Sequence, residues 1–271
     1  MANHPALLNF VRIGSGEPLI ILHGLFGSSK NWHSLTQVFS RYYDVLALDL
    51  RNHGLSFHDD VMDYPAMVDD VYRLLCHLDI HCCRLIGHSM GGKVGMLLAL
   101  RHPQLLSRLV VADIAPVAYT HGYEHLIEPV MALNLDEMES RSAVDRALQN
   151  DIADPKLRHF LLQSLVRDAD RWRWKNNWAA LKQNIDKITG FPEPAQQHEN
   201  GAPVNGQIND WRVSTTTLFI NGGQSDYVDQ KAKAVIRQHF DAAEFKTLAN
   251  AGHWLHAEQP QQFAQAVLEF L

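Results

Sequence analysis

Short apolar runs alternate with helical patterns in the first part of the chain, and this alternation constrains the fold most strongly. The apolar runs have the length of buried strands, and they cover residues 19–22, 44–48, 84–86 and 109–112. Helical patterns separate them at residues 31–40, from Pro65 onward, and at residues 93–102. This alternation favours a mostly parallel sheet with helices on both faces. We therefore predict an α/β fold, with residues 7–13 in an antiparallel edge hairpin.

The alternation stops in the middle of the chain. Residues 117–212 have a helical pattern and contain four of the six tryptophans, and residues 191–209 are rich in Pro, Gly, Asn and Gln, as in a loop or tether. Strand character returns at residues 215–220 and 244–248, and a terminal helix follows Pro260. We predict that residues 1–116 and 213–271 form the core, and that residues 117–212 form an inserted helical cap and tether above the carboxyl edge of the sheet.

Ser89 lies in Gly87-His88-Ser89-Met90-Gly91, between a strand-like run and a helix-like run. This is the spacing of a nucleophile elbow, in which a sharp strand-to-helix turn crowds its neighbours and favours glycine two positions before and after the serine. The turn exposes the serine hydroxyl and places a helix N-terminus beside it, where N–H groups face developing negative charge. Ser89 is the predicted nucleophile.

A serine nucleophile needs a base and an acid that orients the base. His253 is the candidate base, because it follows the last predicted strand after a glycine. Two aspartates are candidate acids. Asp226 follows the strand at residues 215–220, and Asp113 follows the strand after the nucleophile helix. The residues alone leave these two alternatives open.

Backbone N–H groups are the expected donors to the oxyanion. One belongs to Met90, the residue after the serine, and the other to the glycine-rich turn after the first buried strand. We assign the second donor to Leu25, with Phe26 as the alternative one residue on.

Aromatic residues are candidates for substrate binding. Phe26 lies in the glycine-rich turn, and Trp174 and Trp178 are four residues apart, which predicts that both lie on one helix face in the cap. An acyl pocket and simple core packing both remain open for the two tryptophans. An apolar cap indicates a small to medium acyl chain.

Composition and missing motifs exclude several classes of function. The net charge of −6 disfavours binding to nucleic acid or to anionic membranes. The first residues lack the pattern of a signal peptide, no apolar run is long enough for a membrane span, and three cysteines indicate reduced thiols. We expect a cytoplasmic protein. Neither a metal-binding spacing nor a dinucleotide or Walker motif is present, so no metal and no cofactor are expected.

With these motifs, the chain resembles the α/β-hydrolase superfamily over nearly its whole length, and within it the bacterial YbfF-type esterases. Four stretches carry the resemblance: residues 23–28, 49–54, 87–93 and 251–254. It implies a serine hydrolase that cleaves carboxylic esters through an acyl-enzyme intermediate. An acyl-CoA thioesterase and a ligand-binding protein on a hydrolase scaffold are the alternatives. The resemblance also favours Asp113 as the acid, with Asp226 in reserve. The expected partner is a small acyl ester or thioester, and the oligomeric state stays open.

Overall fold

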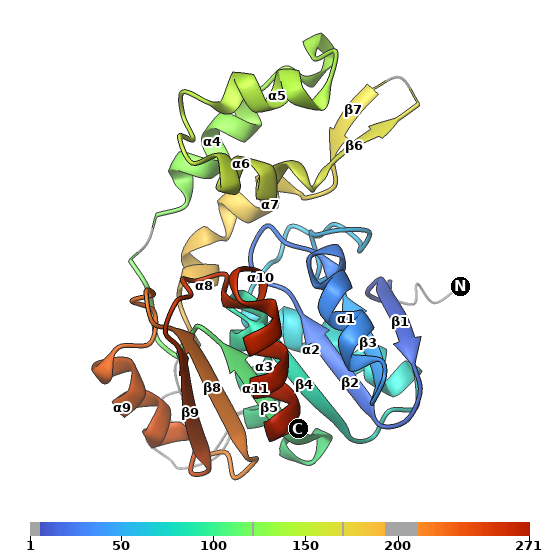
Figure 1. Cartoon of the computed structure of the whole chain (residues 1–271). Coiled ribbons are helices and arrows are strands. Elements are labelled where there is room, and N and C mark those ends of the chain that lie inside the picture. Colours follow the sequence, from blue (N-terminus) through green and yellow to red (C-terminus); the bar gives the residue numbers. More distant parts are fainter. Residues whose placement is uncertain (1–5, 121, 170, 193–210) are drawn as a thin grey trace, which may run out of the picture.

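The computed structural model describes residues 6–120, 122–169, 171–192 and 211–271 (Figure 1). Within them, a seven-stranded sheet has the order β1-β3-β2-β4-β5-β8-β9. Its strands are β1 (Phe10–Gly14), β2 (Pro18–Leu22), β3 (Asp44–Leu48), β4 (Cys83–His88), β5 (Leu106–Ala112), β8 (Thr217–Gly222) and β9 (Ala243–Leu248). All neighbouring strands pair in parallel except β1, which is antiparallel to β3. The predicted α/β fold is confirmed.

The edge strand β1 corrects one expectation. It is antiparallel, as predicted, but it pairs with β3 from Phe10↔Leu48 to Gly14↔Asp44, and β3 separates it from β2. The prediction of a hairpin is therefore wrong. A hydrophobic pattern identifies a strand but not its partner, and the partner here comes from later in the chain.

Helices cover both faces of the sheet, because the buried strands alternate apolar side chains between the two faces. Helices α2 (Tyr64–His77), α3 (Met90–Arg101) and α9 (Gln230–His239) pack on one face, and α1 (His33–Phe39) and α11 (Pro260–Phe270) on the other. Along β2, Ile20 and Leu22 face the first group, whereas Leu19 and Ile21 face the second. The remaining short helices of this part are α10 (Leu255–Glu258) and two 3₁₀ turns, Ser29–Trp32 and Pro103–Leu105.

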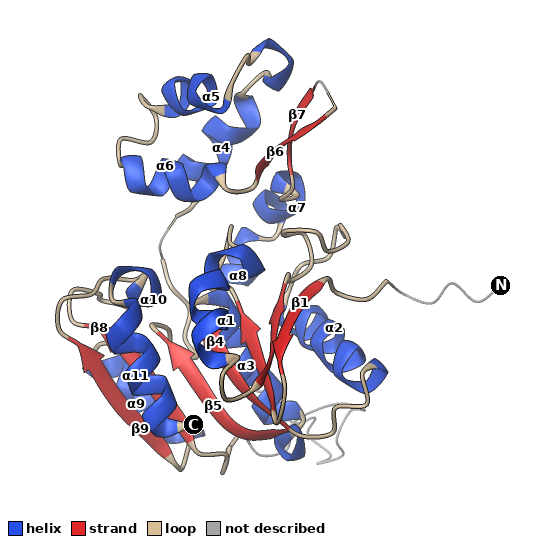
Figure 2. Ribbon diagram, turned by 45° about the vertical axis from the view of Figure 1, so that its right-hand side comes forward, coloured by secondary structure: helices blue, strands red, loops and turns tan. Residues whose placement is uncertain are grey.

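A second lobe arises between β5 and β8. It contains α4 (Glu124–Ala132), a 3₁₀ turn (Leu135–Glu137), α5 (Arg141–Leu148), α6 (Pro155–Leu162), β6 (Leu165–Asp168), β7 (Arg171–Trp174), α7 (Trp178–Gln183) and α8 (Ile185–Thr189). Figure 1 and Figure 2 show α4–α6 and the hairpin β6–β7 standing above the sheet, with α7 and α8 nearer to it. The predicted loop or tether at residues 191–209 lies outside the described residues from position 193 on.

The hairpin β6–β7 contradicts the expectation of helix throughout this lobe. Arg171, Trp172, Arg173 and Trp174 alternate between exposed and half-buried, which is the two-residue period of a strand. Trp174 is thus in β7 and Trp178 is the first residue of α7, so the prediction that both lie on one helix face is wrong. A spacing of four residues fits a strand followed by a turn as well as it fits a helix.

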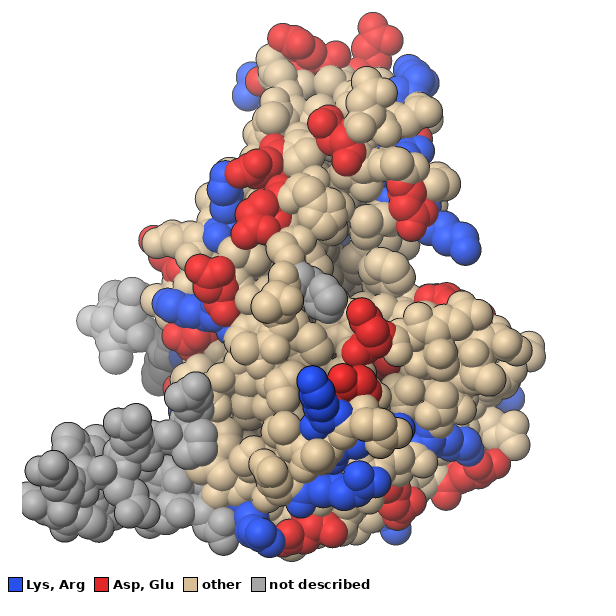
Figure 3. Space-filling model, turned by 90° about the vertical axis from the view of Figure 1, so that its left-hand side faces the viewer, with Lys and Arg blue, Asp and Glu red and all other residues tan. Residues whose placement is uncertain are grey.

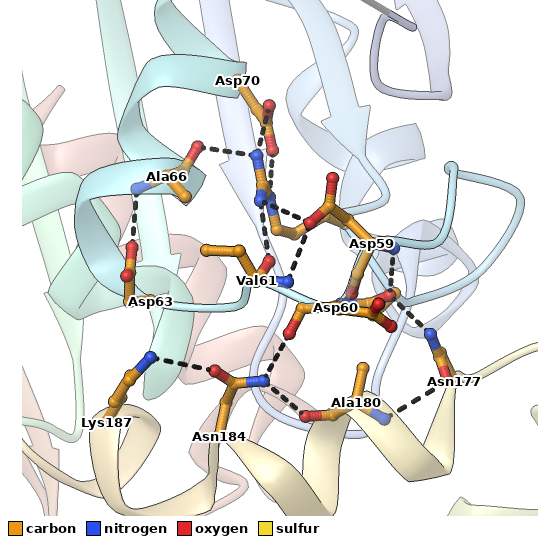
Figure 4. A network of polar contacts seen from close by, with 12 residues as sticks. Asp59, Asp60, Val61, Asp63, Ala66, Asp70, Asn177, Ala180, Asn184 and Lys187 are labelled. Carbon is orange, nitrogen blue, oxygen red and sulfur yellow. Dashed lines mark hydrogen bonds and ion pairs between the residues drawn. The ribbon is translucent and has the colours of Figure 1, made fainter.

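Polar contacts fasten the foot of the second lobe to the core (Figure 4). The Asn177 side chain donates to Asn52 Oδ1 at 3.1 Å, and the Asn177 backbone N–H donates to the Asn52 carbonyl at 3.0 Å. The Asn184 amide donates to the carbonyl of Asp60 at 2.8 Å. These contacts tie α7 and α8 to the loop after β3.

None of the helices in the described ranges combines the length and the hydropathy needed to cross a bilayer.

Candidate active site

Ser89 occupies a sharp turn between β4 and α3. Its backbone has φ +49° and ψ −117°, in a region that residues with a Cβ rarely adopt. The flanking glycines are required by close approach: a Cβ on Gly87 would lie 2.3 Å from the Gly91 carbonyl oxygen, and one on Gly91 would lie 2.5 Å from the Leu22 carbonyl oxygen. The spacing of the motif therefore follows from how tightly α3 packs against β4 and β2.

Strand pairing brings Asp113 next to Ser89. In the parallel ladder of β4 and β5, His88 pairs with Ala112, so the residues that follow the two strands are neighbours. The Ser89 N–H donates to the Ala112 carbonyl at 3.0 Å. Asp113 is fully buried and also has a positive φ, +54°.

His253 lies between the serine and the aspartate. Its Nε2 is 3.1 Å from Ser89 Oγ, and its Nδ1 is 2.8 Å from Asp113 Oδ2. With the proton on Nδ1, His253 donates to the carboxylate and accepts from the serine hydroxyl. The ring of Tyr227 stacks on His253 at a centroid distance of 4.1 Å, which restricts its rotation.

The structure brings Ser89, His253 and Asp113 together and leaves Asp226 apart from them. Asp226 is exposed, and within the described residues it forms no hydrogen bond or ion pair with His253. Its neighbour Ser225 instead donates its hydroxyl to Asp113 Oδ2 at 2.5 Å, and the Gly222 N–H donates to Oδ1 at 3.0 Å. Sequence reasoning missed Ser225, although the loop after β8 was identified.

Two further histidines support the loop of His253. His88 Nε2–H donates to the backbone carbonyl of His253 at 2.9 Å, and burial, with His256 and His253 nearby, lowers the pKa of His88 well below its usual value. His256 stacks on Trp32 at 4.5 Å, and burial lowers the pKa of His256 to about 3. Both rings are therefore neutral at pH 7. His88 acts as a hydrogen-bond donor, whereas His256 packs between Trp32 and His88.

The two candidate positions for the second oxyanion donor differ in their hydrogen bonds. The Phe26 N–H donates to His53 Nε2 at 3.1 Å, and His53 stays neutral because burial lowers its pKa to about 3. In the described part of the chain, no hydrogen bond engages the N–H of Leu25 or that of Met90, the first residue of α3. Leu25 and Met90 thus have donors available beside Ser89, whereas the Phe26 donor is occupied.

Two cavities meet at Ser89. The larger, about 580 Å³, lies between the core loops and the second lobe and is lined by side chains that include Phe26, Leu126, Leu157, Phe160 and Trp254. The smaller measures about 20 Å³, and Leu25, Met90 and Ile188 are among the residues that line it. Neither cavity is lined by Trp174 or Trp178. Trp178 stacks behind Phe26 at 5.0 Å, and Trp174 packs edge-on against Trp178 at 5.7 Å.

No group of three or more His, Cys, Asp or Glu side chains suited to a metal ion occurs among the residues that the structure describes.

The family model for the alpha/beta hydrolase fold matches residues 17–260, and the chain belongs to this family. Among its curated relatives, the sn-1-specific diacylglycerol lipase ABHD11 of Mus musculus is 40% identical over 93% of this chain and 80% of that protein. Esterase YbfF of Escherichia coli is 31% identical over 95% and 94%, which confirms the resemblance to YbfF-type esterases. A solved marine microorganism esterase superimposes with a TM-score of 0.90 at 36% identity, over 98% of this chain and 100% of that one.

Proposed function

We propose that this chain is a serine hydrolase that cleaves carboxylic esters through an acyl-enzyme intermediate. The observation that carries the proposal is the continuous hydrogen-bonded series from Ser89 Oγ through His253 to Asp113. His253 takes the serine proton as Ser89 attacks the acyl carbonyl, and then gives it to the leaving alcohol. Asp113 holds the tautomer of His253 and stabilises its positive charge. Water then hydrolyses the acyl-enzyme by the same route.

The backbone N–H groups of Leu25 and Met90 stabilise the oxyanion. Leu25, Met90 and Ser89 line the same small cavity, and neither N–H is engaged by another acceptor within the described residues, so both are available when charge develops. In other serine hydrolases, removal of one such donor raises the activation free energy of the reaction by about 2.7–4 kcal/mol. The positive end of α3 (Met90–Arg101) adds to this stabilisation.

The larger cavity favours uncharged oxygen esters over acyl-CoA thioesters. The described residues that line it include no Lys, Arg, Asp or Glu. A CoA leaving group carries several phosphate charges, for which this lining offers no cationic partner. The names of the relatives, an esterase and a diacylglycerol lipase, agree with an ester substrate. We assign residues 117–212 as a cap that covers this cavity, and residues 1–116 and 213–271 as the hydrolase core.

We also propose a small-molecule enzyme of the cytoplasm without a nucleic-acid partner. Figure 3 shows Lys and Arg mixed with Asp and Glu over the visible face, without the broad basic patch typical of nucleic-acid binding. Cys76, Cys82 and Cys83 are free thiols, as in reducing compartments.

The test replaces Ser89 by alanine and measures hydrolysis of 4-nitrophenyl acetate. We expect a loss of about 10⁶-fold in kcat, by analogy with removal of the serine from a protease triad. Ser214→Ala, an exposed serine remote from the site, is the matched control and keeps parental activity. Retained turnover in folded Ser89→Ala would refute the nucleophile. A parent that binds esters tightly and turns none over would instead identify a ligand-binding protein.

A further inference from the structure

The smaller cavity lies on the side of Ser89 where both oxyanion donors are found. Its volume is about 20 Å³. The residues that line it include Leu25, Tyr64, Met90, Lys93, Ile188 and Thr189. The larger cavity measures about 580 Å³, so the smaller one has room only for a short chain.

The position of His253 decides which part of an ester enters which cavity. In the tetrahedral intermediate, the leaving oxygen must lie beside the imidazole that protonates it. His253 lines the larger cavity, whereas no histidine is among the described residues that line the smaller one. The alcohol part therefore extends into the larger cavity. With the oxyanion held by Leu25 and Met90, the acyl substituent points toward the smaller cavity.

We propose that the smaller cavity is the acyl subsite and that its size restricts the enzyme to short acyl groups, esterified to bulky, uncharged alcohols. This inference rests on the proposed ester hydrolysis. The sequence predicted a small to medium acyl chain, and this inference restricts that range to short chains. The reason is that the apolar cap encloses the alcohol part of the ester rather than the acyl part.

The wall of the subsite is fixed by hydrogen bonds to the end of α8 (Ile185–Thr189). The buried Lys93 donates from Nζ to the carbonyls of Thr189 and Gly190, at 2.8 and 2.5 Å. The hydroxyl of Tyr64 donates to the carbonyl of Ile188 at 2.5 Å. Three consecutive carbonyls at the end of α8 are thus held against the core, so a longer acyl chain cannot displace this wall without breaking these bonds.

The Ile188 side chain offers a way to enlarge the subsite without touching these contacts. Ile188 is buried and lines the smaller cavity, and its hydrogen bond to Tyr64 uses only the backbone. Ile188→Ala removes wall atoms and keeps the bond. Ile185→Ala is the matched control: it makes the same change in the same helix, at a buried position that lines neither cavity.

The experiment measures kcat/KM for 1-naphthyl acetate, butyrate, hexanoate and octanoate, which vary the acyl chain at a constant alcohol. We expect kcat/KM of the parent to fall by at least ~10-fold from acetate to butyrate. This value is the lower end of the discrimination that a packed pocket achieves against one or two extra methylenes. In Ile188→Ala, the butyrate-to-acetate ratio should rise by about 10-fold, and in Ile185→Ala it should equal that of the parent. Purified variants are checked for folding by circular dichroism.

Each outcome separates the inference from the proposed function. If the parent hydrolyses butyrate or octanoate with the same kcat/KM as acetate, the proposed acyl subsite is refuted, but the proposed ester hydrolysis is not. An equal change in Ile185→Ala also overturns it, because the effect would then be general to α8. If Ile188→Ala does not fold, the kcat/KM values of the parent for the four 1-naphthyl esters still test the acyl subsite. Absence of hydrolysis of every ester refutes the proposed function itself.

Discussion

The carboxylate of Asp113 accepts three hydrogen bonds, from His253, Gly222 and Ser225. Such a carboxylate is fixed in position, because donors from three different residues hold its two oxygens. Asp113→Asn should therefore lower kcat by about 10⁴-fold, since an amide in this position favours the wrong tautomer of His253.

Asp226→Asn is the matched control for this change. The side chain of Asp226 is exposed, and its replacement should leave kcat within about two-fold of the parent, as for a surface substitution away from the reacting groups. Both are measured with 4-nitrophenyl acetate under saturating conditions. A loss confined to Asp226→Asn would transfer the role of the acid to that residue.

Ser89 and His253 could be predicted from the sequence because the constraints on them are local. A tight turn needs glycines at fixed offsets, and these appear in the sequence around Ser89. The choice between Asp113 and Asp226 depends on which strands are neighbours, and the residues alone leave it open. Ser225 was missed because a serine in a loop carries no distinguishing pattern.

At the scale of elements, α3 links the turn at Ser89 to the end of α8 through Lys93. The lysine ammonium lies over the rings of Tyr119 and Tyr64, at 4.8 and 5.6 Å, and bonds carbonyls rather than a carboxylate. Burial lowers the pKa of Lys93 from 10.5 to about 7. Between these two values the unfolded chain binds a proton that the folded chain does not. The contribution of Lys93 to the free energy of unfolding therefore increases as pH rises from 7 toward 10.5.

Lys93→Met should remove this pH dependence. In urea titrations at pH 7 and pH 9, the parent should gain more unfolding free energy at pH 9 than Lys93→Met does. Lys231→Met, at an exposed lysine, should behave like the parent. An equal gain in the parent and in Lys93→Met would contradict a burial-depressed pKa.

Strands that are buried on both faces were predicted correctly from the sequence, whereas the partly buried hairpin β6–β7 was not. The central strands β2 to β5 are almost entirely buried and carry continuous apolar runs. The hairpin β6–β7 is half exposed and consists largely of arginine and tryptophan, so its alternation was read as helix. The partner of β1 could not be predicted, because strand pairing depends on the whole sheet.

At the scale of the whole molecule, the second lobe is joined to the core at α7 and α8. Asn184 is buried, and its amide donates both to Asp60 in the core and to Ala180 in α7. Asn184→Ala should lower the free energy of unfolding by about 0.5–1.5 kcal/mol, because the side-chain hydrogen bond to the Asp60 carbonyl is lost. Asn150→Ala, at an exposed position in the lobe, should change it by less than about 0.5 kcal/mol.

The unfolding of Asn184→Ala also shows whether the two lobes unfold together. Trp172, Trp174 and Trp178 weight the fluorescence toward the second lobe, whereas circular dichroism reports on the helices of both lobes. Because α7 and α8 are hydrogen-bonded to the core, the midpoints of the urea transitions seen by fluorescence and by circular dichroism should decrease by the same amount. Separate transitions for the two probes would show that the lobe unfolds by itself.

The left-handed backbone at Ser89 and Asp113 bears on how such a protein changes over evolutionary time. Each of these conformations costs roughly 1–3 kcal/mol for a residue with a side chain, and glycine would relieve it. Selection for stability alone would therefore favour glycine at position 89, where the proposed reaction needs a hydroxyl. At position 113, glycine would instead leave the Gly222 N–H and the Ser225 hydroxyl without their acceptor. Persistence of the serine at its strained position therefore requires continuing selection for turnover, and a lineage without that selection could gain stability by losing the serine.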